Sequence, residues 1–366
     1  GANTFATHAS LGGYSTFTTT TSSVAQGGAL QETIESVKFN APFKFQSQDR
    51  LVTMQDYKNI ILTENGDLSS INVWGGEDND PPIYGKVFVA AKPTSGSLLS
   101  NQKKDAIRTR LKSRNTLSID LEMVDATYLY VNPTITVRYN PELTSLSAAA
   151  LNDKIQTALI SFEADKLGTF GNKFYLYELS EKLKDADSSF ISVDVDILLE
   201  KRFIPLTTEI STYQINYYQK VFEPHAGHLG SLTSTTFTVD DTNGLNLDHD
   251  GYGILRTYTV DSGSKNYRDN NFGTIDYDTG LITLTNKLIS AYDGDYLSLK
   301  IKPDGKNIFG QRNQIILISG ASIETINDST DTSTSTVGLV ATTGVSTTIS
   351  SDNSTASSGS TTSYSI

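Results

Sequence analysis

Residues 39–93 decide the fold, and they read FNAPFKFQSQDRLVTMQDYKNIILTENGDLSSINVWGGEDNDPPIYGKVFVAAKP. Thr53 is suited to cap a helix, and Asp56 in the first turn is favoured by the exposed N–H groups and the helix dipole. The helix then places apolar side chains on one face, namely Tyr57, Ile60 and Ile61. Gly66 is suited to a left-handed C-terminal cap, so the pattern predicts that the helix stops there.

Two short strands are predicted after this helix. Ile71 and Val73 alternate with a polar residue, and Val87 and Val89 alternate after a polar loop that contains two prolines. The stretch therefore predicts a compact helix-strand-loop-strand unit in which no residues are arranged for a chemical reaction.

The unit combines particular residues at particular places: Pro42, Arg50, Val52, Thr53, Asp56, Tyr57, Trp74, Gly75, Gly76, Gly85 and Val87. This combination resembles the baseplate J-like proteins of contractile tails, and among them the wedge proteins of the gene-product-six type from T-even-like bacteriophages. The resemblance continues in outline to about Phe203. The segment after Phe203 departs from the general family pattern.

The resemblance implies a structural subunit of a phage contractile-tail baseplate, located in the virion and assembled in the host cytoplasm. It implies self-association, as a homodimer and then as a ring around the central hub, with contacts to other wedge and hub proteins. The ring is expected to rearrange on contraction, with rigid domains rotating about linkers. On this interpretation the protein is not an enzyme, and we assign no catalytic, cofactor-binding or metal-binding residues and no cofactor.

Composition narrows the possibilities further. A chain of 366 residues predicts two or three domains, and the absence of cysteine excludes disulfides, cysteine nucleophiles and thiolate metal sites. The formal net charge of -12 disfavours a nucleic acid partner. No apolar run approaches the ~20 residues that cross a bilayer, so we expect a soluble chain without a membrane span. The sequence begins at Gly1 without an initiator methionine, which predicts a fragment of a longer protein.

The pattern predicts a multidomain α+β fold, with a two-layer α/β sandwich core, an inserted antiparallel β domain and extended terminal arms. The predicted segments are an N-terminal arm or linker (1–28), a helix-strand baseplate J-like unit (29–115), an α+β sandwich (116–205), an inserted β domain (206–310), strands that return to the core (311–327) and a Ser/Thr-rich tail (328–366). A short helix with Leu30, Ile34 and Val37 on one face leads into the helix-strand unit. The tail is predicted to become ordered against a partner chain and to support oligomerisation.

Several elements are predicted between residues 98 and 205. A helix over 98–114 carries basic groups outward and buries apolar residues, namely Leu99, Ala106, Ile107 and Leu111. A strand over 117–123 is paired with a strand through Tyr128 and Tyr130, in which Pro133 marks a bulge or an edge. Ser145 or Ser147 caps a helix that ends near Gly168 and buries Leu151, Ile155, Leu159 and Phe162.

Short strands and tight turns dominate residues 206–302. Residues 273–284 predict a hairpin, with Asp278 starting the turn and Gly280 supplying the positive φ. Two further strands, over 315–318 and 323–326, are expected to return to the core.

Two groups of residues suggest metal ligands. His225 and His228 are two residues apart, but a zinc site needs three or four ligands, and only His8 and His249 remain. A calcium loop is suggested by oxygen-bearing residues near two glycines, Gly244 and Gly251: Asp240, Asp241, Asn243, Asp248 and Asp250. The spacing does not match the twelve-residue calcium loop, so turn formation is the preferred interpretation.

Two charged groups remain. Glu77, Asp78 and Asp80 suggest the paired carboxylates of a glycosidase, although a solvated acidic loop is the simpler interpretation. A basic run on the 98–114 helix is interpreted as a solvated face, with an acidic partner protein as the second choice: Lys103, Lys104, Arg108, Arg110, Lys112 and Arg114.

Two functional alternatives stay open beside the baseplate subunit. One is a carbohydrate-binding or adhesive surface protein whose β domain carries recognition. The other is a tail-associated hydrolase that uses the acidic loop.

Overall fold

The computed structural model describes residues 33–48, 50–79, 81–115, 118–224, 231–240 and 242–328, with the short strands β19 (Ser346–Thr347) and β20 (Tyr364–Ser365), which pair with each other. The chain divides into two compact units. One contains the described residues up to Thr134, Ile160–Glu178 and Asp196–Ser322, and the other contains Ile135–Leu159, Leu179–Val195 and the described residues from Ile323 onward. The predicted arm (1–28) and nearly all of the predicted tail (328–366) lie outside the described residues.

The first elements of the chain form a helix-strand module, residues 51–124. It follows helix α1 (Ile34–Ser47) and contains α2 (Met54–Glu64), β1 (Leu68–Gly75), the 3-10 helix η1 (Gly76–Asp78), β2 (Lys86–Pro93), α3 (Asn101–Leu111) and β3 (Asp120–Val124). β1 pairs antiparallel with β2, and β3 pairs parallel with β2. The predicted pairing of strand 117–123 with the strand through Tyr128 is therefore wrong, because α3 forms a crossover that returns β3 to the side of β2.

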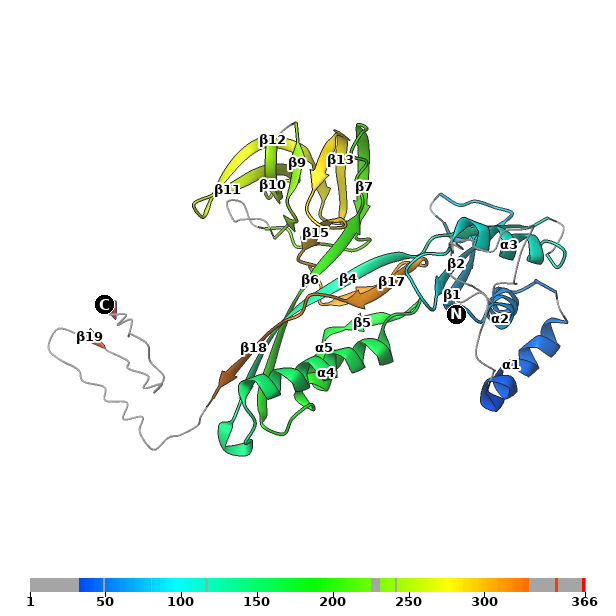
Figure 1. Ribbon diagram of the computed structural model, residues 1–366, viewed down its shortest axis with the longest axis horizontal. Helices are drawn as coiled ribbons and strands as arrows, with labels where there is room; N and C mark the ends of the chain where they lie inside the picture. Colours follow the sequence, from blue (N-terminus) through cyan, green and yellow to red (C-terminus); the bar gives the residue numbers. More distant parts are fainter. Residues whose placement is uncertain are drawn as a thin grey trace, which may run out of the picture. The chain divides into compact units, whose positions relative to one another are not determined.

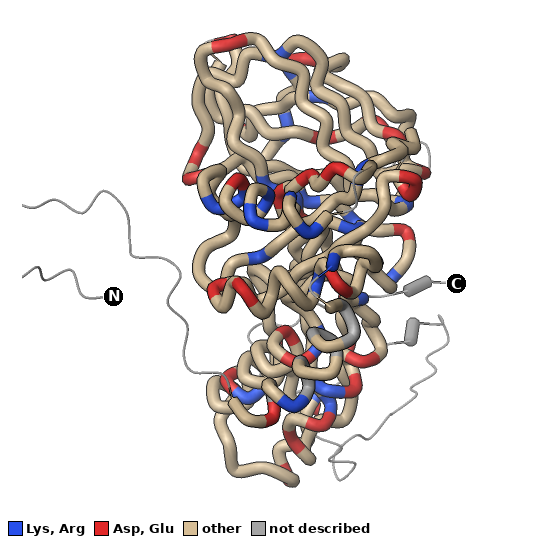
Figure 2. The backbone as a smooth tube through the Cα atoms, turned by 90° about the vertical axis from the view of Figure 1, so that its right-hand side faces the viewer, with Lys and Arg blue, Asp and Glu red and all other residues tan. Residues whose placement is uncertain are grey.

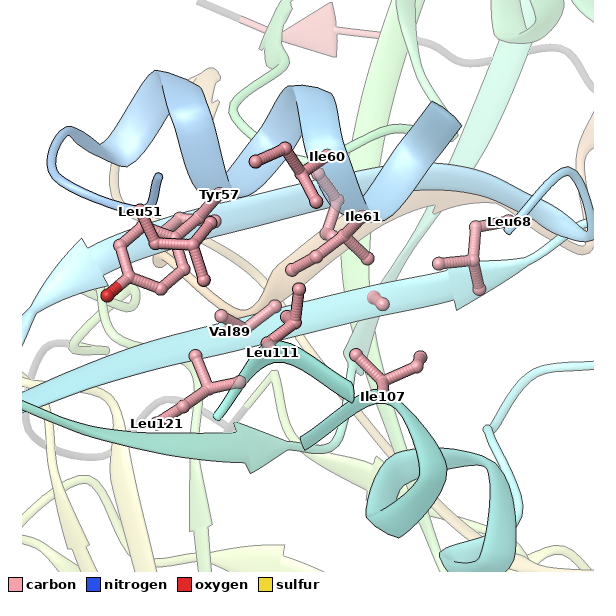
Figure 3. Close-up of a cluster of buried hydrophobic side chains, with 12 residues drawn as sticks. Leu51, Tyr57, Ile60, Ile61, Leu68, Val89, Ile107, Leu111 and Leu121 are labelled. Carbon is pink, nitrogen blue, oxygen red and sulfur yellow. The ribbon is translucent and has the colours of Figure 1, made fainter. Parts of the chain in front are cut away.

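The module has an apolar core between α2, α3 and the three strands (Figure 3). Its buried members are Leu51, Tyr57, Ile60, Ile61, Leu68, Ile71, Val73, Val89, Ala91, Ile107, Leu111 and Leu121. Ile107 and Leu111 are buried as predicted, and Leu99 packs against the core, but Ala106 is exposed. The buried residues of α3 are Ile107 and Leu111, which are four positions apart and so form a narrow stripe along the helix. Ala106 lies beside that stripe.

The predicted start of α2 is confirmed. The Thr53 hydroxyl accepts a hydrogen bond from the Asp56 N–H at 3.2 Å, and the Asp56 carboxylate accepts one from the Thr53 N–H at 2.8 Å, which completes a capping box. The predicted stop at Gly66 is wrong, since α2 ends at Glu64 and Gly66 is not in the left-handed region. Asn65 caps the end instead, and its side-chain amide donates to the Ile61 carbonyl at 2.8 Å, so no left-handed residue is needed there.

A second sheet runs in the order β17, β4, β6, β15 and β8, and β18 also pairs with β4. The bounds are β4 (Thr127–Tyr139), β6 (Phe190–Phe203), β8 (Thr233–Ser234), β15 (Leu297–Ile301), β17 (Gln314–Ile318) and β18 (Ser322–Asn327). β17 is parallel to β4, and β15 is antiparallel to β6. The two strands predicted over 315–318 and 323–326 therefore both pair with β4.

The burial of β4 shows which face of that strand is covered. The buried apolar side chains of β4 are Leu129, Val131, Ile135 and Val137. They are all at odd-numbered positions, so the same face of the strand is buried along its whole length. Tyr128 and Tyr130 are on the other face. Pro133 does not shift this phase. The ladder with β17 ends at Val131, so the missing N–H of Pro133 interrupts none of its pairs.

The helices α4 (Ala148–Lys166) and α5 (Leu176–Lys184) follow β4 and the 3-10 helix η2 (Pro141–Leu143). In the second unit, Figure 1 shows α4 and α5 on one side of β4, β6 and β18. Ser147 is the cap, because its hydroxyl accepts from the Ala150 N–H at 3.3 Å, and the predicted apolar face of α4 is buried. β5 (Lys173–Tyr175) pairs with β16 (Asn307–Phe309). The fold is therefore mixed α+β, while the predicted sandwich layout and segment boundaries stay predictions.

A seven-stranded antiparallel sheet occupies the sequence between β6 and β15, which pair with each other. Its order is β14 (Ile289–Tyr292), β9 (Phe237–Val239), β10 (Thr242–His249), β11 (Ile254–Asp261), β12 (Ser264–Asp276), β13 (Leu281–Lys287) and β7 (Ser211–Asn216).

The hairpin predicted over 273–284 is formed by β12 and β13, and Gly280 has the predicted positive φ of 68°. The carboxylate that starts the turn belongs to Asp276, which accepts the N–H groups of Asp278 and Thr279, and not to Asp278 as predicted. Asp276 is the last strand residue and so is placed to accept the N–H groups of the turn. None of the helices in the described part of the chain is both long and apolar enough to cross a membrane.

Candidate assembly surface

The Trp74-Gly75-Gly76-Glu77 motif shapes the loop between β1 and β2. Trp74 is buried, and its indole N–H donates to the Asn79 side-chain oxygen at 2.8 Å. A Cβ atom on Gly76 would lie 1.9 Å from the carbonyl oxygen of Ile83. The backbone N–H of Ile83 donates a hydrogen bond to the Gly76 carbonyl at 2.8 Å. Gly85 has a φ of 77°, which favours glycine. Trp74, Gly76 and Gly85 therefore have packing and backbone roles in this loop.

Exposed apolar side chains gather on α1 and at the start of α2. The most exposed are Ile34 at 75%, Phe45 at 83% and Val52 at 68%, and they are accompanied by Val37 and Met54. We call these five side chains the assembly surface. Figure 1 shows α1 beside α2. Single exposed apolar residues are ordinary, but a group on adjacent elements marks a contact surface.

The assembly surface adjoins a small hollow of about 200 Å³ that the motif residues line. Val52, Tyr57, Gly75, Gly85 and Val87 all border it, together with Met54. Five of the eleven residues that carry the family resemblance therefore converge in space, although these five are spread over 36 positions of sequence (87 minus 52, both ends included).

The predicted helix with Leu30, Ile34 and Val37 on one face differs from α1. α1 begins at Ile34, continues to Ser47 and includes Pro42, while Leu30 lies outside the described residues.

The basic run on α3 is largely paired within the chain. The amino group of Lys103 lies 3.0 Å from the Asp67 carboxylate and that of Lys104 lies 2.6 Å from the Asp125 carboxylate, and Arg114 pairs with Glu64. Arg108 pairs with Asp105 on the same helix, and Arg110 lies 3.9 Å from Glu64. Figure 2 shows Lys and Arg interspersed with Asp and Glu along the described chain. This pairing favours the solvated face over a docking site for an acidic protein.

The acidic loop takes part in a structural contact. Glu77 and Asp78 belong to η1, and Asp80 lies outside the described residues. The guanidinium of Arg312 donates to the carbonyl of Asp78 and lies 3.8 Å from its carboxylate. Asp78 therefore helps to hold the loop that precedes β17.

The fourth histidine of the sequence is part of the interior of the seven-stranded sheet. His249 is fully buried, its Nε2 accepts the Ser231 N–H at 3.0 Å, and its Nδ1 lies 2.8 Å from the Tyr277 hydroxyl. Since Nε2 accepts, the proton of the neutral ring is on Nδ1 and is donated to Tyr277. Burial lowers the pKa of His249 and raises the pKa of Tyr277 to about 12. His225 and His228 lie outside the described residues.

The suggested calcium ligands have other partners. Asp248 is fully buried, and its carboxylate lies 2.9 Å from the Lys265 amino group and 3.8 Å from Arg256, and it accepts from the Tyr267 hydroxyl. Asp250 accepts two backbone N–H groups in the turn after β10. In the parts of the chain that the structure describes, which leave out Asp241, no three His, Asp or Glu side chains are grouped to hold a metal ion.

A group of buried charges at the end of β6 was missed by the sequence analysis. Glu200 is buried and paired with Arg202 at 2.6 Å, and it accepts from the Asn132 amide at 2.7 Å. The guanidinium of Arg202 lies over the Tyr130 ring, 3.7 Å from its centroid. Lys201, between them, is 9% exposed. The available signal was the run of three consecutive charges that directly follows Ile197-Leu198-Leu199, because alternation must turn at least one of them to each face.

Comparisons with known proteins agree with the sequence motifs. Residues 53–124 match the family described as "Baseplate structural protein gp6, C-terminal domain I", and residues 127–202 match "Baseplate structural protein gp6, C-terminal domain III". The baseplate wedge protein gp6 of Enterobacteria phage T4 is 25% identical over 220 residues, which covers 56% of this chain. This chain matches 33% of that protein's length. Among solved structures, the baseplate of the anti-feeding prophage gives a TM-score of 0.33 at 14% identity, over 46% of this chain and 37% of that one.

The predicted likeness to gp6-type wedge proteins is confirmed by these matches, whereas the J-like assignment stays a prediction. With matches to two gp6 domains over residues 53–124 and 127–202, this chain is similar to the gp6-type baseplate wedge proteins of bacteriophages.

Proposed function

We propose that this chain is a structural subunit of a phage contractile-tail baseplate, located in the virion tail. The observation that carries the proposal is the match of two consecutive segments, 53–124 and 127–202, to two domains of a baseplate structural protein. The protein's role is mechanical: it holds neighbouring subunits in place and carries out no reaction.

The proposed contacts are with a second copy of the chain and with other wedge and hub proteins, in a ring that surrounds the hub and rearranges on contraction. The assembly surface supports this proposal, since it leaves five apolar side chains in water. Full burial of one such side chain is worth about 1.5–3 kcal/mol. Several together are needed to offset the ~4–15 kcal/mol that association costs in lost freedom.

The internal pairing of charges also supports a structural role. Asp78 contacts Arg312, and the basic groups of α3 are paired with Asp67, Asp125 and Glu64. Charges paired in this way help to fix the positions of elements.

Analytical ultracentrifugation of the purified chain and of the double variant Ile34→Ser, Phe45→Ser tests the proposed self-association. We expect a dimer for the unchanged chain at micromolar concentration, and a shift toward monomer for the variant. Tyr252→Ser is a matched control, because it removes an equally exposed large side chain, at 73%, from the turn between β10 and β11. A chain that stays monomeric at high micromolar concentration, or a variant that dimerises like the control, would contradict the proposed surface.

Electron microscopy of the chain mixed with the other tail proteins of its phage tests the baseplate role itself. We expect the chain in ring or wedge assemblies. Its failure to enter any assembly with those proteins would overturn the proposal.

A further inference from the structure

β18 has a neighbouring strand on one side only. It pairs with β4, and no other strand in the described part of the chain pairs with it. The Asp328 N–H, directly after β18, donates to the Tyr139 carbonyl of β4 at 2.9 Å. Backbone groups alternate in direction along a strand, so those of Ile323, Thr325 and Asn327 face away from β4. The outer edge of β18 therefore presents the N–H and C=O groups of these residues to a further strand.

Two other edges of the same sheet are covered or charged. Beside β17, the Gly168 N–H donates to the Ile316 carbonyl at 3.1 Å. β6 extends beyond its pairing with β15, and there the Asp196 carboxylate accepts the Ile197 N–H at 3.1 Å and lies 2.7 Å from the Lys302 amino group. A covering segment and a charged side chain are both ways in which proteins prevent a sheet edge from pairing with another chain.

The sequence of β18 offers little protection of this kind. The strand reads SIETIN over Ser322–Asn327, with no proline and no lysine, and Glu324 is its one charged residue. Isoleucine and threonine are residues that favour strands. An edge with this composition is a template for the addition of another strand.

The order of residues in β18 suits the same strand of a second copy. When two β18 strands run antiparallel about a two-fold axis at Thr325, Ile323 of each copy lies opposite Asn327 of the other, so every outward residue has a partner. Thr325 then meets the same residue of the second copy, and such threonine pairs are favourable across strands. Glu324 lies opposite Ile326, so no carboxylate directly faces another.

We propose that the outer edge of β18 pairs antiparallel with the same edge of a second copy of the chain, with Thr325 on the two-fold axis. The inference rests on the proposed function, because it supplies a second self-contact. A contact that uses the same patch on both copies joins only two of them, so a ring needs another. Two six-residue strands are expected to bury less than the ~1,200 Å² of stable interfaces, so the contact should be weak until other contacts hold the copies together.

A cysteine on the two-fold axis tests this pairing directly, since the chain contains no cysteine of its own. Opposite residues in a hydrogen-bonded antiparallel pair have Cα atoms about 5.5 Å apart, which a disulfide can span. We expect the full chain with Thr325→Cys to form disulfide-linked dimers under mild oxidation at least about tenfold faster than Ser290→Cys, as measured on non-reducing gels. Ser290 is the matched control, because it is exposed and belongs to β14, an edge strand of the seven-stranded sheet.

Sedimentation of Thr325→Lys gives a second measurement, which needs no disulfide. The variant places like charges opposite each other at the axis, so it is expected to stay dimeric at high micromolar concentration, where the unchanged chain forms larger species. Ser290→Lys is expected to sediment like the unchanged chain. Thermal unfolding checks that Thr325→Lys is folded, and the cysteine result decides by itself if the lysine lowers the unfolding temperature.

Hydrogen exchange identifies any other occupant of the edge. We expect the peptide that contains Ile323 and Thr325 to exchange readily in dilute solution and to be protected at high micromolar concentration. Protection already in dilute solution would show that the chain covers this edge itself, and Thr325→Cys that links no faster than Ser290→Cys would exclude the symmetric pairing. Either result overturns the inference. Failure of the baseplate role is seen separately, in the microscopy of mixed tail proteins, and does not alter the linking of Thr325→Cys.

Discussion

The helix-strand module and the seven-stranded sheet fill their interiors differently. The core of the module consists of apolar side chains, such as Ile61, Leu111 and the ring of Tyr57. The seven-stranded sheet also buries Asp248 and His249, each with specific partners. The stability of the module should therefore depend mainly on shape and backbone geometry, whereas that of the sheet should depend on keeping each buried polar group paired.

The largest expected effect is on the backbone of the module. Gly76→Ala would place a methyl group 1.9 Å from the Ile83 carbonyl oxygen. Because that atom belongs to the backbone and cannot rotate away, we expect a loss of more than about 3 kcal/mol in the free energy of unfolding, measured in urea. Gly305→Ala is the control, since a methyl group there meets no atom within 4 Å and its φ is not positive. Equal stabilities of the two variants would contradict the importance of the close turn.

The next effect concerns charge pairing in the seven-stranded sheet. Asp248→Asn leaves Lys265 and Arg256 beside a neutral side chain, and we expect a loss of about 2–3 kcal/mol, measured by the same unfolding experiment. Asp261→Asn removes an exposed carboxylate at the end of β11 and should change stability by less than about 0.5 kcal/mol. A small effect of Asp248→Asn would mean that the sheet, like the module, is stabilised by apolar packing alone.

A smaller effect is expected at the start of α2. Thr53→Ala removes the hydroxyl that accepts the Asp56 N–H, so we expect a loss of about 1 kcal/mol in urea unfolding. Thr63→Ala, on the exposed side of the same helix, is the control and should be neutral or slightly stabilising, because alanine is the better helix former. A loss in Thr63→Ala as large as that in Thr53→Ala would assign the effect to the helix as a whole and not to its cap.

The smallest effect is a pH dependence of the seven-stranded sheet. Burial lowers the pKa of His249 below its ordinary value of 6.5, so the unfolded chain takes up this proton first as the pH falls. Stability is therefore complete above pH 6.5 and declines below it, by at most about 0.7 kcal/mol between pH 6.5 and 6.0. His249→Gln should remove this slope from thermal unfolding curves recorded over that range. An unchanged slope in the variant would assign the pH dependence to other groups.

The local features of the fold were predictable wherever the signal lies within a few residues. The Thr53 cap, the buried face of α2 and the turn glycine at Gly280 each follow from neighbours in sequence. The predictions that failed depend on distant partners. β3 pairs with β2 and not with β4, because the pairing depends on where the α3 crossover returns the chain.

The functional residues divide in the same way. The sequence motifs were sufficient to indicate the likeness to gp6-type proteins, and several of those residues form a turn or a cap in this chain. They did not indicate the buried charges at the end of β6, because Glu200 finds one of its partners, Asn132, on β4. A partner on another strand has no signature in the linear sequence.

The sequence by itself determined the local conformation of this protein, its acidic balance and its relation to wedge proteins, because caps, turns and alternation act over a few residues. Only the tertiary structure decided how the buried charges found partners: Glu200 and Asp248 did so through Asn132 and Lys265, which lie 68 and 17 positions away. The physical reason is that the free energy of a buried charge depends on what surrounds it in space.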